Sequence, residues 1–156
     1  MVNRLVLFFL GFLLFMPASA LAACDCSNVR EVFGEYTTVE VTRFRGGLTP
    51  REEAMDRVDK KILVSEDLFF LWDGVRYESP SYEMVCHPVT QDEGEVTPPS
   101  ERRGDFYGFG MDRDVINVIY VNSLSEEGPR YHFEVVGDEL WFFYDGWFYR
   151  MKRVSS

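Results

Sequence analysis

The sequence has few of the residues from which catalytic and metal sites are usually built. It contains two histidines, His87 and His132, and three cysteines, Cys24, Cys26 and Cys86. It has no Gly-x-Ser-x-Gly nucleophile elbow, no His-Glu-x-x-His zinc motif and no phosphate-binding glycine loop. Its acidic residues do not follow the spacing of a calcium-binding loop. We therefore expect a protein that is not an enzyme and that uses no metal or cofactor.

Basic residues are also scarce. The chain has 16 lysines and arginines against 26 aspartates and glutamates, which gives a formal net charge of −10. An acidic surface repels nucleic acid and anionic lipid surfaces and attracts cationic proteins. The charge thus argues against nucleic acid as a partner and favours a cationic protein, although plain solubility also explains an acidic surface.

Only one long hydrophobic run is present, and it lies at the N-terminus. Arg4 precedes it, Leu5 to Met16 is apolar apart from Gly11, and Pro17 and a series of small residues follow. The run is shorter than the roughly 20 residues of a transmembrane helix. This pattern predicts a secretion signal over residues 1–23, with an uncleaved anchor as the alternative.

The end of the predicted signal, Leu21-Ala22-Ala23-Cys24, resembles the lipobox of bacterial lipoproteins. The resemblance implies that Cys24 is lipidated and that the mature chain is held to a membrane on the periplasmic side of the cell envelope. Ordinary cleavage after Ala22 or Ala23 would instead give a soluble periplasmic or secreted protein. An odd cysteine count favours the lipid, because Cys26 and Cys86 then remain as a disulfide pair in an oxidising compartment.

Residues 24–156 have the length of a single domain. Removing residues 1–23 takes away Arg4 and leaves 26 acidic and 15 basic side chains, a net charge of −11. Short runs of β-branched and aromatic residues, bounded by glycine, aspartate, asparagine or proline, are typical of an antiparallel β protein. Strands are predicted within 32–44, 61–64, 68–72, 75–77, 82–89 and 114–121, with a turn at Asp73-Gly74.

One helix and a C-terminal meander complete the prediction. Thr49-Pro50-Arg51-Glu52 combines an N-cap residue, a proline at the first helical position and a capping glutamate, so a helix is expected from there to about Val58. Three strands, 131–136, 140–144 and 147–154, are joined by turns at Gly137-Asp138 and Asp145-Gly146. Apolar residues on both faces of these strands indicate a sheet covered on each side, by the helix or by a second sheet. The expected fold is a small antiparallel barrel or sandwich with one helix.

Residues 90–104 have almost nothing to bury and include Pro98-Pro99. We expect a long exposed loop, and such loops inside compact domains are often functional. The glycine-rich stretch 104–110 that follows lacks the lysine and helix of a phosphate site, so a bent strand or loop end is expected there.

The order of these features resembles a loose group of uncharacterised exported bacterial proteins. The resemblance rests on the helix from Thr49 and on segments 61–69, 79–82 and 145–153. It implies a fold and a compartment but no activity. The barrel-like pattern is also similar to lipocalin-type and lysozyme-inhibitor lipoproteins, although the signature loop of the inhibitors is absent.

Two hypotheses about function follow. The first is a cell-envelope protein that binds or inhibits a cationic protein, such as a lysozyme-like enzyme or a toxin, through acidic turns and exposed aromatic residues. The carboxylates expected to contact that partner are Asp92, Glu93, Glu95, Asp112, Asp114 and Asp145. The alternative is a carrier of a small ligand within an aromatic-lined barrel interior.

Overall fold

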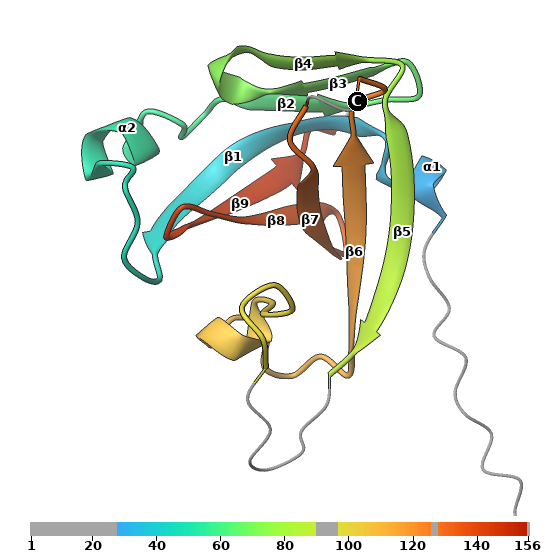
Figure 1. Cartoon of the computed structure of the whole chain (residues 1–156). Coiled ribbons are helices and arrows are strands. Elements are labelled where there is room, and N and C mark those ends of the chain that lie inside the picture. Colours follow the sequence, from blue (N-terminus) through green and yellow to red (C-terminus); the bar gives the residue numbers. More distant parts are fainter. Residues whose placement is uncertain (1–27, 90–96, 126–127, 156) are drawn as a thin grey trace, which may run out of the picture.

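The computed structural model describes residues 28–89, 97–125 and 128–155, which form one curled antiparallel sheet (Figure 1). Its nine strands are β1 (Gly34–Arg43), β2 (Lys61–Val64), β3 (Leu68–Leu71), β4 (Val75–Glu78), β5 (Ser81–Pro88), β6 (Val115–Asn122), β7 (Tyr131–Val136), β8 (Glu139–Tyr144) and β9 (Trp147–Arg153). The described helical elements are α1 (Val29–Val32), α2 (Arg51–Met55) and the 3-10 turns η1 (Trp72–Gly74) and η2 (Asp105–Tyr107). The predicted mainly β fold with a C-terminal three-stranded meander is confirmed.

The nine strands form one open sheet in the order β4-β3-β2-β1-β9-β8-β7-β6-β5. Strands that lie next to each other in the sheet are consecutive in the chain, except for β1 and β9. That seam runs in register from Tyr36 opposite Arg153 to Arg43 opposite Trp147, with an irregularity near Thr38. The two edge strands, β4 and β5, follow each other in the chain. The result is a curled half-barrel rather than two separate sheets.

The two halves of the curled sheet share one aromatic core on its inner face. Alternation along each strand sends one set of side chains inward. Among the completely buried side chains are Tyr36, Ile62, Phe69, Phe133, Leu140, Tyr149 and Met151. The rings of Phe69 and Phe133 bring the halves together at 5.9 Å between centroids. A hydrogen bond also links the two halves of the sheet. The Tyr82 hydroxyl on β5 donates to the Ser65 carbonyl beside β2 at 2.8 Å.

Helix α2 is shorter than expected, and Thr49 does not cap it. The helix ends at Met55, and its N-cap position is Pro50, which has no side-chain capping bond. The Thr49 hydroxyl instead donates to Asp145 in the β8–β9 turn at 2.7 Å. A carboxylate acceptor makes a stronger hydrogen bond than a neutral group does, so the tertiary contact prevails over the local cap. On this helix Ala54 is buried, whereas Met55 is 41% exposed.

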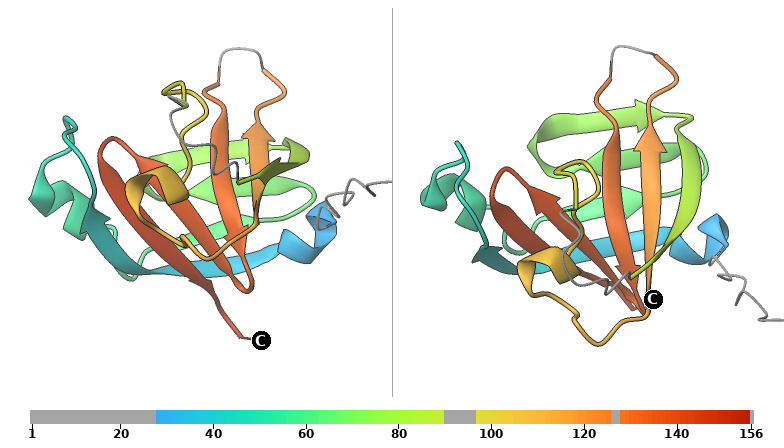
Figure 2. Two further views of the ribbon diagram at one scale, coloured as in Figure 1. Left: turned by 90° about the horizontal axis from the view of Figure 1, so that it is seen from below. Right: turned by 60° about the horizontal axis from the view of Figure 1, so that its bottom comes forward.

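The outer face of β6–β9 is covered by the connection between β5 and β6, residues 97–113, which we call the covering segment (Figure 2). Its aromatic residues pack on aromatic residues of the sheet. Tyr107 lies 4.5 Å from Phe44 between ring centroids, and Phe109 lies 4.4 Å from Phe148. The prediction that both faces are covered is right, but the cover is an irregular segment rather than a helix or a second sheet.

Candidate functional site

Glu134 on β7 holds the covering segment at two points. The backbone N–H of Gly104 donates to Glu134 Oε1 at 2.6 Å, and Arg113 Nη1 lies 2.9 Å from Glu134 Oε2. A Cβ atom at Gly104 would lie only 2.9 Å from the Phe143 ring, so this close approach requires glycine. Burial raises the pKa of Glu134, while the Gly104 N–H and the Arg113 guanidinium oppose that rise. The segment is therefore positioned by a buried ion pair.

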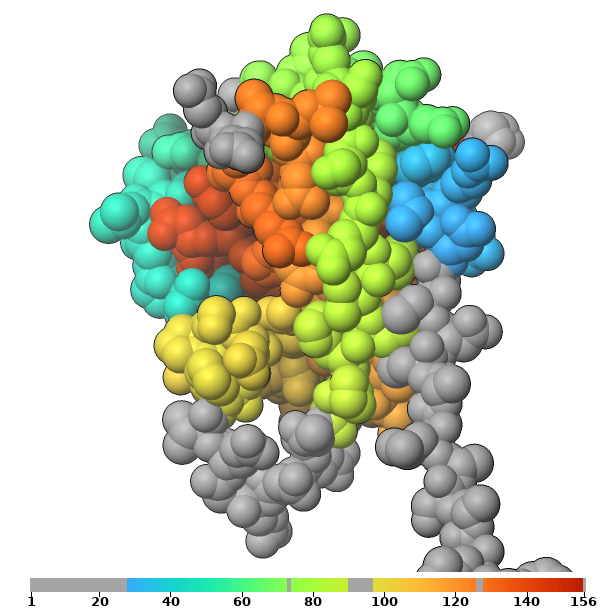
Figure 3. Space-filling model, turned by 45° about the vertical axis from the view of Figure 1, so that its right-hand side comes forward, coloured from blue at the N-terminus to red at the C-terminus, as the bar shows by residue number. Residues whose placement is uncertain are grey.

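A cavity of about 580 Å³, here called the acidic cavity, opens between the covering segment and the ends of β5 and β6. Its walls include the carboxylates of Glu101 and Asp105, one arginine, Arg103, and the apolar side chains of Phe106, Met111 and Ile116. Phe106 is 48% exposed and Met111 64% exposed, although both are apolar. In Figure 3 the covering segment (yellow) lies beside the lower end of β5 (green). Exposed apolar side chains next to carboxylates are the composition of a surface that binds another molecule.

Of the carboxylates predicted to bind a partner, the three in the described part of the chain, Asp112, Asp114 and Asp145, are not among the residues that line this cavity. Asp112 and Asp114 are exposed and directly follow Met111 in the chain. Asp92, Glu93 and Glu95 lie outside the described residues. Within the predicted loop, residues 98–101 are exposed as expected, whereas Gly104 is buried.

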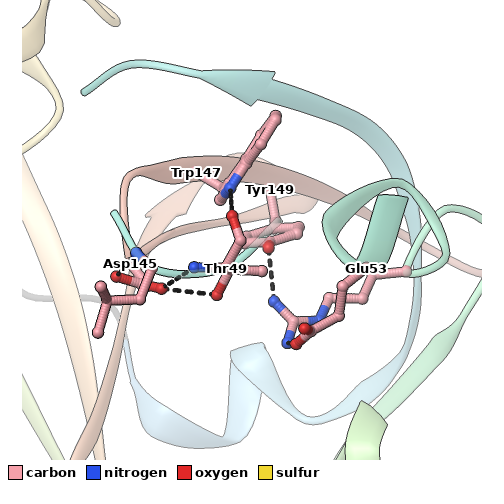
Figure 4. A network of polar contacts seen from close by, with 7 residues as sticks. Thr49, Glu53, Asp145, Trp147 and Tyr149 are labelled. Atoms are coloured by element: carbon pink, nitrogen blue, oxygen red, sulfur yellow. Dashed lines mark hydrogen bonds and ion pairs between the residues drawn. The ribbon is translucent and has the colours of Figure 1, made fainter. Parts of the chain in front are cut away.

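Asp145 lies in the β8–β9 turn, where its side chain binds residues 48 and 49 (Figure 4). It accepts hydrogen bonds from the Leu48 N–H at 3.0 Å and from the Thr49 N–H and hydroxyl. The Trp147 indole N–H donates to the Thr49 carbonyl at 3.0 Å and completes the network. The Thr49 hydroxyl and the two N–H groups lower the pKa of Asp145. The sequence could not show that this carboxylate already has partners within the chain.

A second cavity, of about 140 Å³, lies on the other side of Arg102 and Arg103, and we call it the arginine pocket. The residues that line it are Arg45, Arg102, Arg103, His132, Phe44, Tyr107, Phe143, Pro99 and Ser100. Arg103 Nη2 donates to the Tyr120 hydroxyl at 2.9 Å, whereas Arg103 Nε is buried without a hydrogen-bond partner.

Both histidines lie near these arginines. Burial, with smaller contributions from Arg103, Arg130 and His87, lowers the pKa of His132 to about 4. Burial and Arg103 also lower the pKa of His87. The two imidazoles are therefore neutral at pH 7. Sequence reasoning missed the arginine pocket. The signal that was available is Arg102-Arg103 directly before an aromatic, glycine-rich stretch.

The interior of the half-barrel is filled by side chains. Its mouth holds a cavity of about 90 Å³, lined by Arg57, Trp72, Tyr144 and neighbouring residues. Arg57 lies over the Trp72 ring at 4.6 Å and donates to the Tyr149 hydroxyl at 2.6 Å. It also pairs with Glu53 at 3.1 Å. Glu53 and Tyr149, the two partners of Arg57, are labelled in Figure 4. Small-molecule sites are usually about 300–1,000 Å³, so this mouth is too small for one.

The predicted lipidation and the predicted disulfide both involve cysteines outside the described residues. Cys24 and Cys26 are in residues 1–27, so lipidation of Cys24 and the Cys26–Cys86 disulfide stay predictions. Cys86 lies on β5, next to His87. Adjacent residues of a strand point to opposite faces of the sheet. The Cys86 and His87 side chains are therefore not placed to act together as a nucleophile and its base.

The described residues also limit the chemistry that can be assigned. Within residues 28–89, 97–125 and 128–155, no group of three or more histidine, cysteine, aspartate or glutamate side chains could hold a metal ion. In the same ranges, no helix has the length and apolar character to cross a membrane. The two cavities beside the covering segment are therefore the sites from which function can be argued.

No protein-family model, no curated protein and no solved structure matches the chain.

Proposed function

We propose that the chain is a non-enzymatic binding protein of the bacterial cell envelope that captures a cationic protein at the acidic cavity. A lysozyme-like enzyme or a toxin is the class of partner that its compartment and charge favour. Lipid on Cys24 would hold the mature chain at the membrane, where such proteins act. The proposal is supported by the net charge of −10 and by the composition of the cavity rim.

The observation that carries the proposal is the combination of carboxylates and exposed apolar side chains around one opening. Glu101 and Asp105 are in the cavity wall, and Asp112 and Asp114 are exposed and come just after Met111 of that wall in the chain. Phe106 and Met111 supply apolar area at the same place. Acidic groups accelerate association with a cationic partner, and a few apolar anchors supply most of the affinity.

The filled interior favours this binder over a small-ligand carrier. Trp72, Phe142 and Tyr149 occupy the space that a carrier would keep open, and each is at most 4% exposed. The cavity that remains at the mouth measures about 90 Å³. A carrier of a drug-sized ligand needs several times that volume.

The test compares two double variants of equal net charge. D112K/D114K reverses two exposed carboxylates that come just after Met111 of the acidic cavity, whereas E66K/D67K reverses two in the β2–β3 turn, at the other end of β5. Binding of a panel of basic cell-wall hydrolases is measured by surface plasmon resonance at low and moderate salt. We expect the first variant to slow association about tenfold at low salt and to weaken its salt dependence, and the control to change it by less than about threefold.

Equal effects of the two variants would show net charge alone and would contradict a site at the acidic cavity. If the mature domain retains no basic protein even at low salt, the proposed function is wrong, because electrostatic attraction is strongest under those conditions.

Export and anchoring are tested separately by mass spectrometry of the mature N-terminus. We expect a chain that begins at Cys24 and carries acyl groups, and the C24A variant should lose membrane association. A chain that begins at Ala23, or at an unmodified Cys24, would contradict the lipid anchor. Thiol labelling of the denatured, unreduced protein tests the disulfide, because labelling of both Cys26 and Cys86 would exclude that pair.

A further inference from the structure

The arginine pocket is unusual for so acidic a chain. Six arginines elsewhere in the described residues pair with carboxylates, as Arg57 does with Glu53 and Arg130 with Glu83. Arg43, Arg51 and Arg153 have no such pair there, but none of them lines a cavity with other arginines. Arg45, Arg102 and Arg103 line one pocket, and in the described part of the chain none of the three has a carboxylate oxygen within 4.0 Å. Three guanidinium groups near one cavity repel each other unless an anion lies between them.

The contacts of these arginines hold them in place without neutralising them. Arg45 lies over the Phe44 ring at 5.5 Å, and Arg102 lies over the Phe106 ring at 4.4 Å. Arg102 Nε donates to the Thr97 carbonyl at 3.1 Å. Rings and carbonyl oxygens orient a guanidinium group while leaving its full charge, which is the arrangement that binds an anion with little rearrangement.

Arg103 provides the most direct indication of a missing acceptor. Its Nη1 donates to the Ser100 carbonyl at 3.2 Å and its Nη2 to the Tyr120 hydroxyl. Its Nε is buried and has no hydrogen-bond partner. A buried donor without an acceptor is costly, and an anion in the adjoining pocket would supply one.

We propose that the arginine pocket binds one small oxyanion, a carboxylate or a phosphate, with Arg45, Arg102 and Arg103 as its cationic walls. Planar guanidinium groups match the paired oxygens of both anions. The rings of Phe44, Tyr107 and Phe143 line the same cavity, whose volume of about 140 Å³ is too small for a drug-sized ligand. This site goes beyond the proposed function and does not depend on it, because it needs no cationic partner and lies across Arg103 from the acidic cavity.

His132 offers a direct readout, since it lines the arginine pocket. An anion bound there would stabilise the imidazolium and raise the pKa of His132 above its value of about 4. The mature domain is titrated by NMR in inorganic phosphate, in trifluoroacetate, a carboxylate that stays ionised where His132 titrates, and in chloride at equal ionic strength. We expect phosphate or trifluoroacetate to raise this pKa by roughly one unit relative to chloride. A response to phosphate alone assigns a tetrahedral anion, and a response to both assigns a general oxyanion site.

Variants locate the effect. R45Q and R103Q should each weaken phosphate or trifluoroacetate binding at least about tenfold. R51Q, on α2, removes the same charge from an exposed arginine outside the pocket and should leave binding unchanged. Arg45 is also exposed, so its substitution keeps the test meaningful if R103Q does not fold. The proposal is overturned if neither anion acts beyond chloride, or if R51Q weakens binding as much as R45Q does.

Discussion

Two carboxylates, Glu134 and Asp145, fix long connections against the sheet in different surroundings. Each accepts a hydrogen bond from the backbone of a segment far away in the sequence, Glu134 from Gly104 and Asp145 from Leu48 and Thr49. Glu134 is buried and its pKa is raised, chiefly by burial. Hydrogen bonds, led by that of the Thr49 hydroxyl, lower the pKa of Asp145. The comparison shows that burial, rather than the type of bond, decides how each contact depends on pH.

The largest effect is expected from loss of the buried carboxylate. E134A leaves the Arg113 guanidinium without its partner and the buried Gly104 N–H without its acceptor. Removing one member of a buried ion pair usually costs about 3–5 kcal/mol in the free energy of unfolding. Urea unfolding at pH 7 measures the loss. Trypsin should also cut faster after Arg102, Arg103 and Arg113, because the covering segment opens more often.

The matched control for this prediction is E35A. Glu35 pairs with Lys61 at 2.6 Å, but both side chains are well exposed. Such a pair contributes less than about 1 kcal/mol. Equal losses for E134A and E35A would contradict the role of Glu134 in holding the covering segment.

The strands and turns of the sheet were predictable from the sequence, whereas the position of the covering segment on its outer face was not. The meander over β7, β8 and β9 follows from alternating apolar residues and from glycine turns such as Asp145-Gly146. The covering segment lies where composition predicted an exposed loop and a bent strand or loop end. Its position depends on Glu134, which is 30 residues from Gly104, and a contact over that separation leaves no periodic pattern.

The candidate sites were less predictable than the fold for the same reason. Asp112 and Asp114 were identified from charge alone and are exposed, but they are not among the residues that line the acidic cavity. Asp145 has the same side chain, yet it already binds residues 48 and 49. Arg45 and Arg102 are far apart in the sequence but line the same arginine pocket, and only the tertiary structure shows this. Composition gives the charge of a surface but not which charges have partners.

An intermediate effect is expected from His132, which lies two residues from Glu134 on the same strand. The pKa of His132 is about 4 in the folded chain and 6.5 in a model peptide, so the unfolded chain binds a proton first as the pH falls. Stability from this group is complete above pH 6.5 and is lost as the pH falls toward 4. The free energy of unfolding should decrease by about 3 kcal/mol over that range.

Urea unfolding of the wild type and H132Q at pH 7 and pH 4.5 measures the His132 contribution. H132Q should show a smaller decrease, because glutamine does not titrate. H87Q is the matched control, since His87 is less buried and its pKa is lowered less. If H132Q keeps the full pH dependence of the wild type, another group causes the decrease and the assignment to His132 is wrong.

The smallest effects should come from acid titration of the two carboxylates, with opposite signs. The pKa of Glu134 is raised above 4.5, so the folded chain takes up this proton first, and its contribution to stability increases as the pH falls through that range. The pKa of Asp145 is lowered below 3.8, so its contribution is present above pH 3.8 and decreases as the pH falls further.

The difference between wild type and a neutral variant isolates each carboxylate. The wild type should gain stability relative to E134Q as the pH falls from 7 toward 4.5, because the amide cannot take up the proton. The wild type should lose stability relative to D145N below pH 3.8, because the Asp145 carboxylate is protonated there whereas the asparagine amide does not titrate. T49V should diminish the second change, since the Thr49 hydroxyl is the main cause of the lowered pKa of Asp145. If both differences had the same sign, burial would not be what distinguishes the two contacts.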